Sequence, residues 1–472
     1  MNNGAGSAAK LMNLNRFYRQ KFGLGTGISA MAVVVLIAGQ VNALVAEPLS
    51  NQGPVKVQIL RTNNGYQLYV DHQPFYIKGA GLGSGPQEKL VEHGGNSIRT
   101  WRTEGGRVPA RQLLASARTN GLYVTMGLEI GSERHGFDYD DTAAVARQLE
   151  SVKAEVLKYK DDPALIVWAI GNELNLEAKN PKVWDAVNDL SKMIHQADTN
   201  HLTTTPLAGF NKDLIRQVKA RASDLDLLSF QMYADVVNLP RYLEEAGWDR
   251  PYMVTEWGAT GHWEVPKTDW GAPIENDSTT KANYYKRRFE VAIQADHKRC
   301  LGSYVFLWGH KQERTPTWYG MFLETGEETA AVDVMHFLWT GAWPAIRNPQ
   351  LSGAWLNGKT ARQSIHLKRG ENYPARIEAG ADEHGPLRYT WEVLEESRDL
   401  KTGGDAETKP QNVPGLIQPV KPGEIILRAP AEPGAYRLFA YVFNGKDRAA
   451  HVNIPFYVDK EKAASLSSLA SP

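Results

Sequence analysis

Short apolar segments alternate with amphipathic segments from residue 75 to about residue 340. Eight of the apolar segments have the length of buried strands, namely 75–80, 96–101, 123–130, 165–172, 202–206, 226–232, 252–257 and 302–308. Helical spacing is clearest in two places, where apolar residues step by four, three and four: Val145, Leu149, Val152 and Val156, then Val183, Val187, Leu190 and Ile194. This alternation over roughly 290 residues predicts an α/β fold, a (β/α)₈ TIM barrel. A doubly wound sheet is the alternative, because a sequence does not show closure.

The segments on either side of this region have a different pattern. Residues 55–70 contain two short alternating runs separated by Asn63, Asn64 and Gly65, which predicts a hairpin. Residues 349–458 lose the helical period and contain alternating runs such as RYTWEVL and YRLFAYVF between Gly and Pro turns. We therefore expect a barrel domain with its hairpin over 54–345, a β-sandwich of immunoglobulin-like architecture over 349–458, and a disordered tail over 459–472.

The first 46 residues resemble an export signal. They contain no Asp or Glu, and four basic residues precede the apolar run ISAMAVVVLIA at 28–38. Small residues suited to cleavage follow near Ala43 and Ala46. We expect a periplasmic or extracellular protein, with an uncleaved membrane anchor as the alternative to a cleaved signal peptide.

Composition narrows the function classes. The 53 Lys and Arg residues balance 53 Asp and Glu residues, so the net charge of zero gives no support to a nucleic-acid partner. Cys300 is the single cysteine, which excludes a disulfide framework and a cysteine-rich metal site, and its apolar neighbours predict a core position. The 13 Trp and 19 Tyr residues are more than a core usually needs.

Two glutamates carry the candidate chemistry. Glu173 follows Asn172 at the end of the apolar segment 165–172, and Glu256 stands near the end of the segment 252–257. Active sites of TIM barrels gather at the carboxyl ends of the strands, so these ends of strands four and seven would bring both carboxylates to one mouth. A pair of carboxylates there can act as the acid/base and the nucleophile of a glycosidase. Taken singly, each glutamate is equally well explained by a salt bridge.

With these residues the sequence resembles the clan A glycoside hydrolases, and it is most similar to family 2 TIM-barrel domains. The segments Phe75-Tyr76-Ile77-Lys78-Gly79 and Gly95-Asn96-Ser97-Ile98-Arg99 contribute to the resemblance. It implies Glu173 as acid/base and Glu256 as nucleophile. It also implies that Asn172 bonds the sugar 2-hydroxyl, that Arg99 and Tyr233 hold Glu256, and that Trp308 forms the floor of the sugar subsite.

The chain departs from that family in two respects. Relatives often have His or Asn two residues before the tyrosine of strand six, whereas this chain has Gln231, which leaves the local hydrogen bonds open. Family 2 enzymes usually carry β-sandwich domains before the barrel, and here the predicted sandwich follows it.

Several tryptophans stand at or just after predicted strand ends, where an indole can stack on a sugar. Trp101 and Trp257 are candidates for substrate binding, with core packing as the equal alternative. Further aromatic candidates in polar loops are Trp263, Trp270 and Trp318. Weaker candidates for contacts to sugar hydroxyls are Glu129, His262 and Glu264.

We therefore expect an exported retaining glycoside hydrolase or transglycosylase whose partner is a β-linked glycan, preferably an uncharged one. The alternative is a catalytically inactive protein that binds carbohydrate or assembles surface polysaccharide. No cofactor is expected, and a metal-dependent hydrolase is disfavoured because no H-x-H ends strand one and no H-E-x-x-H is present.

Overall fold

The computed structural model describes residues 47–49, 53–104, 106, 108–380 and 385–460. The expected export signal over 1–46 and residues 461–472 of the expected tail lie outside the described residues. In the described part of the chain, no helix combines the length and the apolar character that crossing a membrane requires.

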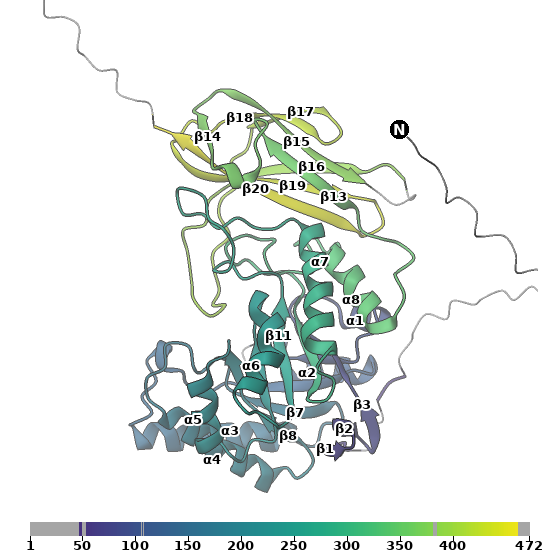
Figure 1. Ribbon diagram of the computed structural model, residues 1–472, viewed down its shortest axis with the longest axis vertical. Helices are drawn as coiled ribbons and strands as arrows, with labels where there is room; N and C mark the ends of the chain where they lie inside the picture. The colour runs from purple at the N-terminus through teal and green to yellow at the C-terminus, as the bar shows by residue number, and fades with distance from the viewer. Residues whose placement is uncertain (1–46, 50–52, 105, 107, 381–384, 461–472) are drawn as a thin grey trace, which may run out of the picture. The chain divides into compact units, whose positions relative to one another are not determined.

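The centre of the fold is a parallel sheet in the order β8-β7-β6-β5-β4-β12-β11-β10-β9 (Figure 1). Its edge strands β8 and β9 are separated along the chain only by Thr205, so together they form the fifth strand of an almost closed barrel. Each of the eight predicted strand segments overlaps this sheet, and the prediction of a TIM barrel is confirmed at this level. The strands are β4 (Ile77–Leu82), β5 (Ser97–Arg99), β6 (Tyr123–Leu128), β7 (Leu165–Ile170), β8 (Leu202–Thr204), β9 (Pro206–Ala208), β10 (Leu228–Gln231), β11 (Tyr252–Gly258) and β12 (Cys300–Trp308).

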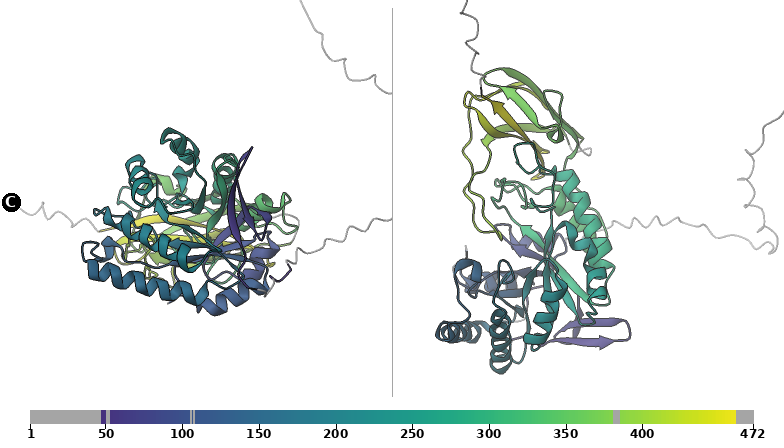
Figure 2. Two further views of the ribbon diagram at one scale, coloured as in Figure 1. Left: turned by 90° about the horizontal axis from the view of Figure 1, so that it is seen from below. Right: turned by 60° about the vertical axis from the view of Figure 1, so that its left-hand side comes forward.

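Helices follow the barrel strands and cover the sheet (Figure 2). The two that the sequence indicated most clearly begin at Thr142 and Lys182, and the apolar stripe of the second is buried from Val183 to Ile194. The helices are α1 (Gln87–Glu92), α2 (Ala110–Thr119), α3 (Thr142–Tyr159), α4 (Lys182–Ala197), α5 (Lys212–Arg221), α6 (Leu239–Glu245), α7 (Ser278–Arg288) and α8 (Ala330–Thr340), with the short turns η1 (Glu133–His135), η2 (Ala234–Asn238), η3 (Phe289–Gln294) and η4 (Ala361–Gln363).

The predicted hairpin closes one end of the barrel. It consists of β1 (Val57–Thr62), β2 (Gly65–Val70) and β3 (Gln73–Phe75), which pair antiparallel. Its apolar side chains pack with residues at the beginnings of the barrel strands, among them Ile77, Leu202 and Leu301. Because the amino-terminal end of the barrel is covered in this way, the opposite end is the one that can admit a ligand.

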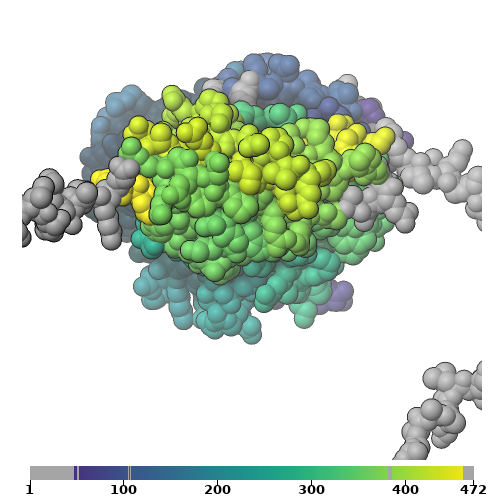
Figure 3. Space-filling view, turned by 90° about the horizontal axis from the view of Figure 1, so that it is seen from above, coloured from purple at the N-terminus to yellow at the C-terminus, as the bar shows by residue number. Residues whose placement is uncertain are grey.

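The C-terminal region is a pair of four-stranded sheets, whose outer surface is drawn in green and yellow in Figure 3. Their facing sides enclose an apolar core that includes Leu356, Leu427 and Phe456. The sandwich prediction therefore holds as an all-β region, whereas immunoglobulin-like architecture stays a prediction. One sheet is β13 (Gln350–Leu356), β15 (Asn372–Gly380), β18 (Glu424–Arg428) and β17 (Ile417–Lys421); the other is β14 (Ile365–Lys368), β20 (Ala449–Asp459), β19 (Gly434–Phe443) and β16 (Arg388–Glu395).

Buried polar groups join the sandwich to the barrel. The carboxylate of Glu275 accepts hydrogen bonds from Lys281 and from Asn453 of β20. Arg437 of β19 donates to the carbonyl oxygen of Pro273 at 2.7 Å. Since unpaired buried polar groups are costly, these bonds fix the docking of the two regions.

Candidate functional site

The predicted site residues lie at the carboxyl end of the barrel strands. Arg99 is the last residue of β5, Gln231 is the last residue of β10, and Glu256 belongs to the final part of β11. Asn172 and Glu173 come directly after β7. Four strands that are far apart in sequence therefore contribute to a single polar cluster.

Glu256 is held by four hydrogen-bond donors and is only 6% exposed. Its Oε1 atom accepts from Arg99 Nη1 at 2.7 Å, from Trp101 Nε1 at 2.8 Å and from Gln231 Nε2 at 2.9 Å. Its Oε2 atom accepts from the Tyr233 hydroxyl at 3.1 Å. These donors, one of them a buried guanidinium, stabilise the carboxylate in its charged form.

Asn172 belongs to the same network as Glu256. Its Oδ1 atom accepts from Arg99 Nη2 at 2.6 Å and from Gln231 Nε2 at 2.9 Å. The acceptor side of the amide is thus occupied, which leaves its NH₂ group as the part that could bond a ligand. Gln231, which stood out in the sequence only as a departure from the family, bridges Asn172 to Glu256.

Glu173 occupies a different environment. Its backbone has a φ of +50°, and its amide donates to the carbonyl oxygen of Pro206 at 3.0 Å. Left-handed backbone at a residue other than glycine costs roughly 1 to 3 kcal/mol, and it is concentrated at functional sites. Burial of the carboxyl group, and then the negative charge of Glu256, raise the pKa of Glu173 to about 8. Glu173 therefore keeps its proton at neutral pH.

Aromatic side chains surround the carboxylates. Phe306 of β12 meets the rings of Trp101 and Tyr233 edge to face, at centroid distances of 5.9 and 6.1 Å. Trp263 also packs edge to face on Tyr233, at 5.5 Å, and it is 58% exposed. A flat ring that is open to solvent beside the carboxylates can stack on a sugar.

Two predicted substrate contacts are in the core instead. Trp308 is fully buried, packs on Phe322 and Trp339, and donates from Nε1 to the carbonyl oxygen of Pro86. Trp257 is fully buried between the barrel and α7. Neither ring has a face that a sugar could reach, so the structure does not support a substrate contact for either. Phe306 is the aromatic residue of β12 beside Glu256.

The weaker candidates have other partners. Trp318 is buried and donates to the carbonyl oxygen of Thr260, and Trp270 packs on His366 and Tyr457 of the sandwich. Glu264 accepts three backbone N–H groups, one from its own loop and two from the segment that follows β10, and so joins these two segments.

His262 and Glu129 lie nearer the mouth of the barrel. His262 packs against Trp263, and burial lowers its pKa to about 4, so its imidazole is neutral at neutral pH. Glu129 is exposed and pairs with Arg102 at 3.0 Å.

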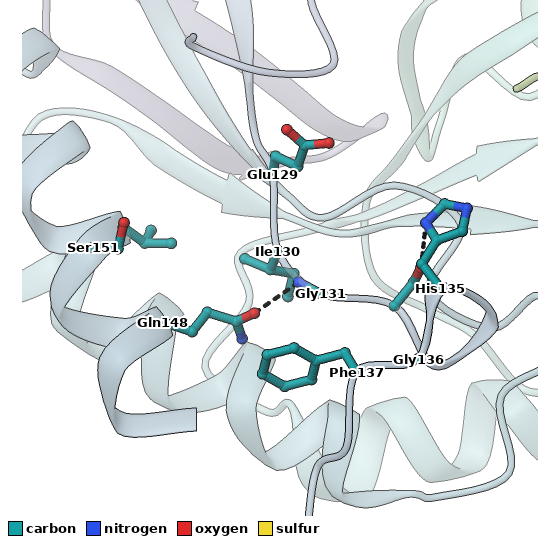
Figure 4. Close-up of a pocket in the computed structure, with 10 residues that line it drawn as sticks. Glu129, Ile130, Gly131, His135, Gly136, Phe137, Gln148 and Ser151 are labelled. Atoms are coloured by element: carbon teal, nitrogen blue, oxygen red, sulfur yellow. Dashed lines mark hydrogen bonds between the residues drawn. The ribbon is translucent and has the colours of Figure 1, made fainter. Parts of the chain in front are cut away.

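A hollow of about 460 Å³ is lined by residues of the loop that follows β6 and of α3 (Figure 4). Gln148 accepts the backbone N–H of Gly131 within it, and Phe137 and His135 form part of its lining. The polar network of Glu256 does not line this hollow. The hollow is therefore not part of the candidate site around Glu173 and Glu256.

Two further predictions concern metals and Cys300. Over residues 53–380 and 385–460, apart from the undescribed 105 and 107, no group of three or more His, Cys, Asp or Glu side chains is arranged to hold a metal ion. Cys300 is buried at the beginning of β12, as predicted, and burial raises the pKa of its thiol to about 12.

Comparisons with known proteins give only distant matches. No family model matches the chain, and no curated protein matches it. Among solved structures, a β-glucuronidase from Ruminococcus gnavus is 15% identical, with 61% of this chain and 53% of that chain covered and a TM-score of 0.47. A putative β-galactosidase from Bacteroides fragilis is 14% identical, with 88% and 59% covered and a TM-score of 0.45. The chain spans about half the length of the first structures that it matches.

Proposed function

We propose that this protein is an exported retaining glycoside hydrolase that acts on a β-linked glycan. Glu173 is the acid/base and Glu256 is the nucleophile. The observation that carries the proposal is the contrast between the two carboxyl groups. Glu256 is clasped by a guanidinium and three neutral donors, whereas burial and the charge of Glu256 raise the pKa of Glu173 to about 8. A carboxyl group that holds its proton, together with a second one that accepts four hydrogen bonds, matches the needs of glycoside cleavage.

The retaining mechanism rests on the way the two groups are joined. Retaining enzymes hold their carboxyl groups about 5 to 5.5 Å apart, and inverting enzymes leave room for a water between them, at about 6.5 to 9.5 Å. Arg99 and Gln231 each bond to both Glu256 and Asn172, the residue next to Glu173. This shared network favours the closer arrangement. Among the described residues, Tyr233 alone donates to Oε2 of Glu256, so this oxygen is the one that we expect to attack the sugar.

The remaining network has supporting roles in this proposal. The NH₂ group of Asn172 donates to a sugar hydroxyl, because Arg99 and Gln231 occupy its oxygen. Burial raises the pKa of Tyr233 well above its ordinary value, so its hydroxyl remains a donor to Glu256. Trp263 offers a stacking surface at the rim. Whether water or a second sugar accepts the glycosyl group decides between hydrolysis and transglycosylation.

The test is an assay of purified residues 47–472 on a panel of β-linked oligosaccharides and polysaccharides. Glu256→Ala and Glu173→Ala should each lose about 10³-fold or more of the activity. Azide should partly restore Glu256→Ala and yield a glycosyl azide of inverted configuration. Glu150→Ala is the control, because this carboxylate is exposed on α3 and takes no part in the network of Glu256. Full activity of either catalytic variant would refute the assignment.

The anomeric configuration of the first product, followed by proton NMR, tests the retaining mechanism separately. If the protein cleaves no glycan but is retained on glycan affinity gels, the binding alternative replaces the enzyme.

Export is proposed on the pattern of residues 1–46 alone. Fractionation of cells that produce the full chain, together with N-terminal sequencing of the recovered protein, tests it. Recovery of the uncleaved chain in the cytoplasm would refute it.

A further inference from the structure

A long loop leaves the sandwich and approaches the barrel. It comprises residues 396–416, between β16 and β17, and we call it the sandwich loop. At its base, Arg437 Nε donates to Glu396 Oε2 at 2.8 Å. Farther along, the backbone N–H of Thr408 donates to Asp399 Oδ2 at 2.9 Å. The loop is therefore held in one conformation by its own hydrogen bonds.

One contact of the sandwich loop is with the barrel loop that follows β6. Asp405 accepts hydrogen bonds from Arg134 Nη1 and Nη2 at 3.0 and 3.3 Å, and it lies 3.1 Å from His135 Nε2. The carbonyl oxygen of Thr402 also accepts from Arg134, at 3.1 Å. The Arg134 side chain is only 10% exposed, whereas the Asp405 and His135 side chains are 43% and 54% exposed, so this contact lies at the surface of the protein.

A second contact is with the barrel loop that follows β12. Glu407 is fully buried and accepts from the backbone N–H of Arg314 at 2.6 Å and from Arg314 Nη1 at 2.7 Å. The carbonyl oxygen of Gly404 accepts from Lys311 Nζ at 2.7 Å. Gly404 has a φ of +72°, and a Cβ atom there would lie only 3.0 Å from Lys311 Nζ. Glycine at position 404 thus lets the sandwich loop and the loop after β12 approach each other this closely.

The two anchoring points lie on different sides of the barrel mouth. In the sheet, β6 and β12 are separated by β5 and β4. The shorter way round the ring between these two loops runs over the ends of β5 and β4, and we infer that the sandwich loop follows it. The right-hand view of Figure 2 shows a yellow-green loop descending from the sandwich to the barrel.

The sandwich loop also approaches the nucleophile. Lys311, which donates to Gly404, lies 5.5 Å from the ring centroid of Phe306. Phe306 in turn packs on Trp101, and Trp101 donates to Glu256. The side chains of Lys311, Phe306 and Trp101 therefore form a continuous series of contacts from Gly404 of the sandwich loop to Glu256.

We propose that the sandwich loop is a wall of the substrate site that determines which glycan bonds are cleaved. The proposal rests on the proposed function. With the mouth closed above β4 and β5, a glycan can extend only over the opposite strands, near the exposed ring of Trp263. The chain end then rests against the sandwich loop, and cleavage takes place at a fixed number of sugars from that end. A purely mechanical role explains less, because Glu275 and Arg437 already join the sandwich to the barrel.

The experiment replaces residues 401–407 by two glycines in the 47–472 protein. Because Asp399 and Thr408 are hydrogen-bonded to each other, a short connection can span the gap without strain. The substrate is an end-labelled hexasaccharide of a glycan that the wild type cleaves, and the products are separated at early times. The wild type should release one short product from one end, whereas the variant should also cleave internal bonds. The ratio of kcat/KM for the hexasaccharide to kcat/KM for an aryl monoglycoside should change by about tenfold.

A milder variant and a control complete the design. Asp405→Ala removes the side-chain contacts of Asp405 with Arg134 and His135 without shortening the chain, and it should shift the products in the same direction as the deletion. This variant serves as the test if the deletion variant does not fold. Arg376→Ala is the control, because it removes an ion pair between two residues of the sandwich, Arg376 and Glu378. It should keep the wild-type pattern of products. Unchanged products and an unchanged ratio in both loop variants would overturn the inference and leave the proposed function intact. A wild type that cleaves no glycan would refute both.

Discussion

Replacing Glu173 by glutamine should make the protein more stable while it abolishes activity. Burial and the charge of Glu256 raise the pKa of this carboxyl group from 4.5 to about 8 in the folded protein. As the pH rises above 4.5, the unfolded chain releases the proton and the folded protein retains it. The free energy of unfolding therefore falls with pH through this window, and the loss is complete above about pH 8.

The size of the effect follows from the two pKa values. Each pH unit between them corresponds to about 1.4 kcal/mol, so the wild type loses roughly 3 kcal/mol by pH 7 and roughly 5 kcal/mol above pH 8. These figures are upper limits, because part of the Glu173 side chain is in contact with solvent, which weakens the effect. Glutamine has nearly the same shape and no proton to release, so the Glu173→Gln variant does not lose this free energy of unfolding as the pH rises.

Urea unfolding followed by tryptophan fluorescence measures the difference. We expect Glu173→Gln to exceed the wild type by at least about 1 kcal/mol at pH 8.5 and by much less at pH 5. Glu129→Gln, which alters an exposed carboxylate, should show no such rise with pH. A difference between Glu173→Gln and wild type that stays constant with pH, or shrinks as the pH rises, would contradict the reasoning.

Three more predictions concern the catalytic cycle. The value of kcat/KM for a neutral glycoside should fall as the pH passes about 8, because Glu173 must hold its proton to act as the acid, and a flat profile up to pH 10 would exclude that role. Gln231→Ala should lower kcat by roughly 10- to 100-fold, since it removes a hydrogen bond to the carboxylate of Glu256. A variant that changes KM alone would contradict this role of Gln231. Trp263→Ala should raise KM for oligosaccharides severalfold with little change in Tm, since the ring is exposed. The matched change Trp318→Ala in the core should instead cost about 3 to 5 kcal/mol of stability.

The barrel could be predicted from the sequence because its strands are local apolar runs of regular length. The ends of those runs also identified Glu173 and Glu256 as candidates, since parallel strands present their carboxyl ends at the same end of the barrel. The contacts of Gln231 depend on the register between β10 and β11, which shifts after Phe230. No local pattern reveals such a shift.

The predictions of a substrate contact for Trp257 and for Trp308 failed for different physical reasons. Successive residues of a strand point to opposite faces, so once Glu256 points into the barrel, Trp257 must point outward. That signal was present in the sequence. Trp308 is different, because the register of β12 against β4 shifts between Val305 and Trp308, and simple alternation does not apply there. The position of the sandwich loop could not be predicted from the sequence, because its barrel contacts join residues 85 to 271 positions apart.

The network around Glu256 has a consequence for how activity arises as the chain folds. Arg99 and Glu256 are 157 residues apart, and the shorter path in the sheet between the strands that carry them, β5 and β11, runs through β4 and β12. β12 begins at Cys300, so a nascent chain that ends before this residue lacks the strand that pairs with both β4 and β11. We therefore expect no glycan cleavage from such a chain. Glycan cleavage would then show that the ring of strands is complete. Two fragments of the chain, divided between β11 and β12, should be active only after they reassociate.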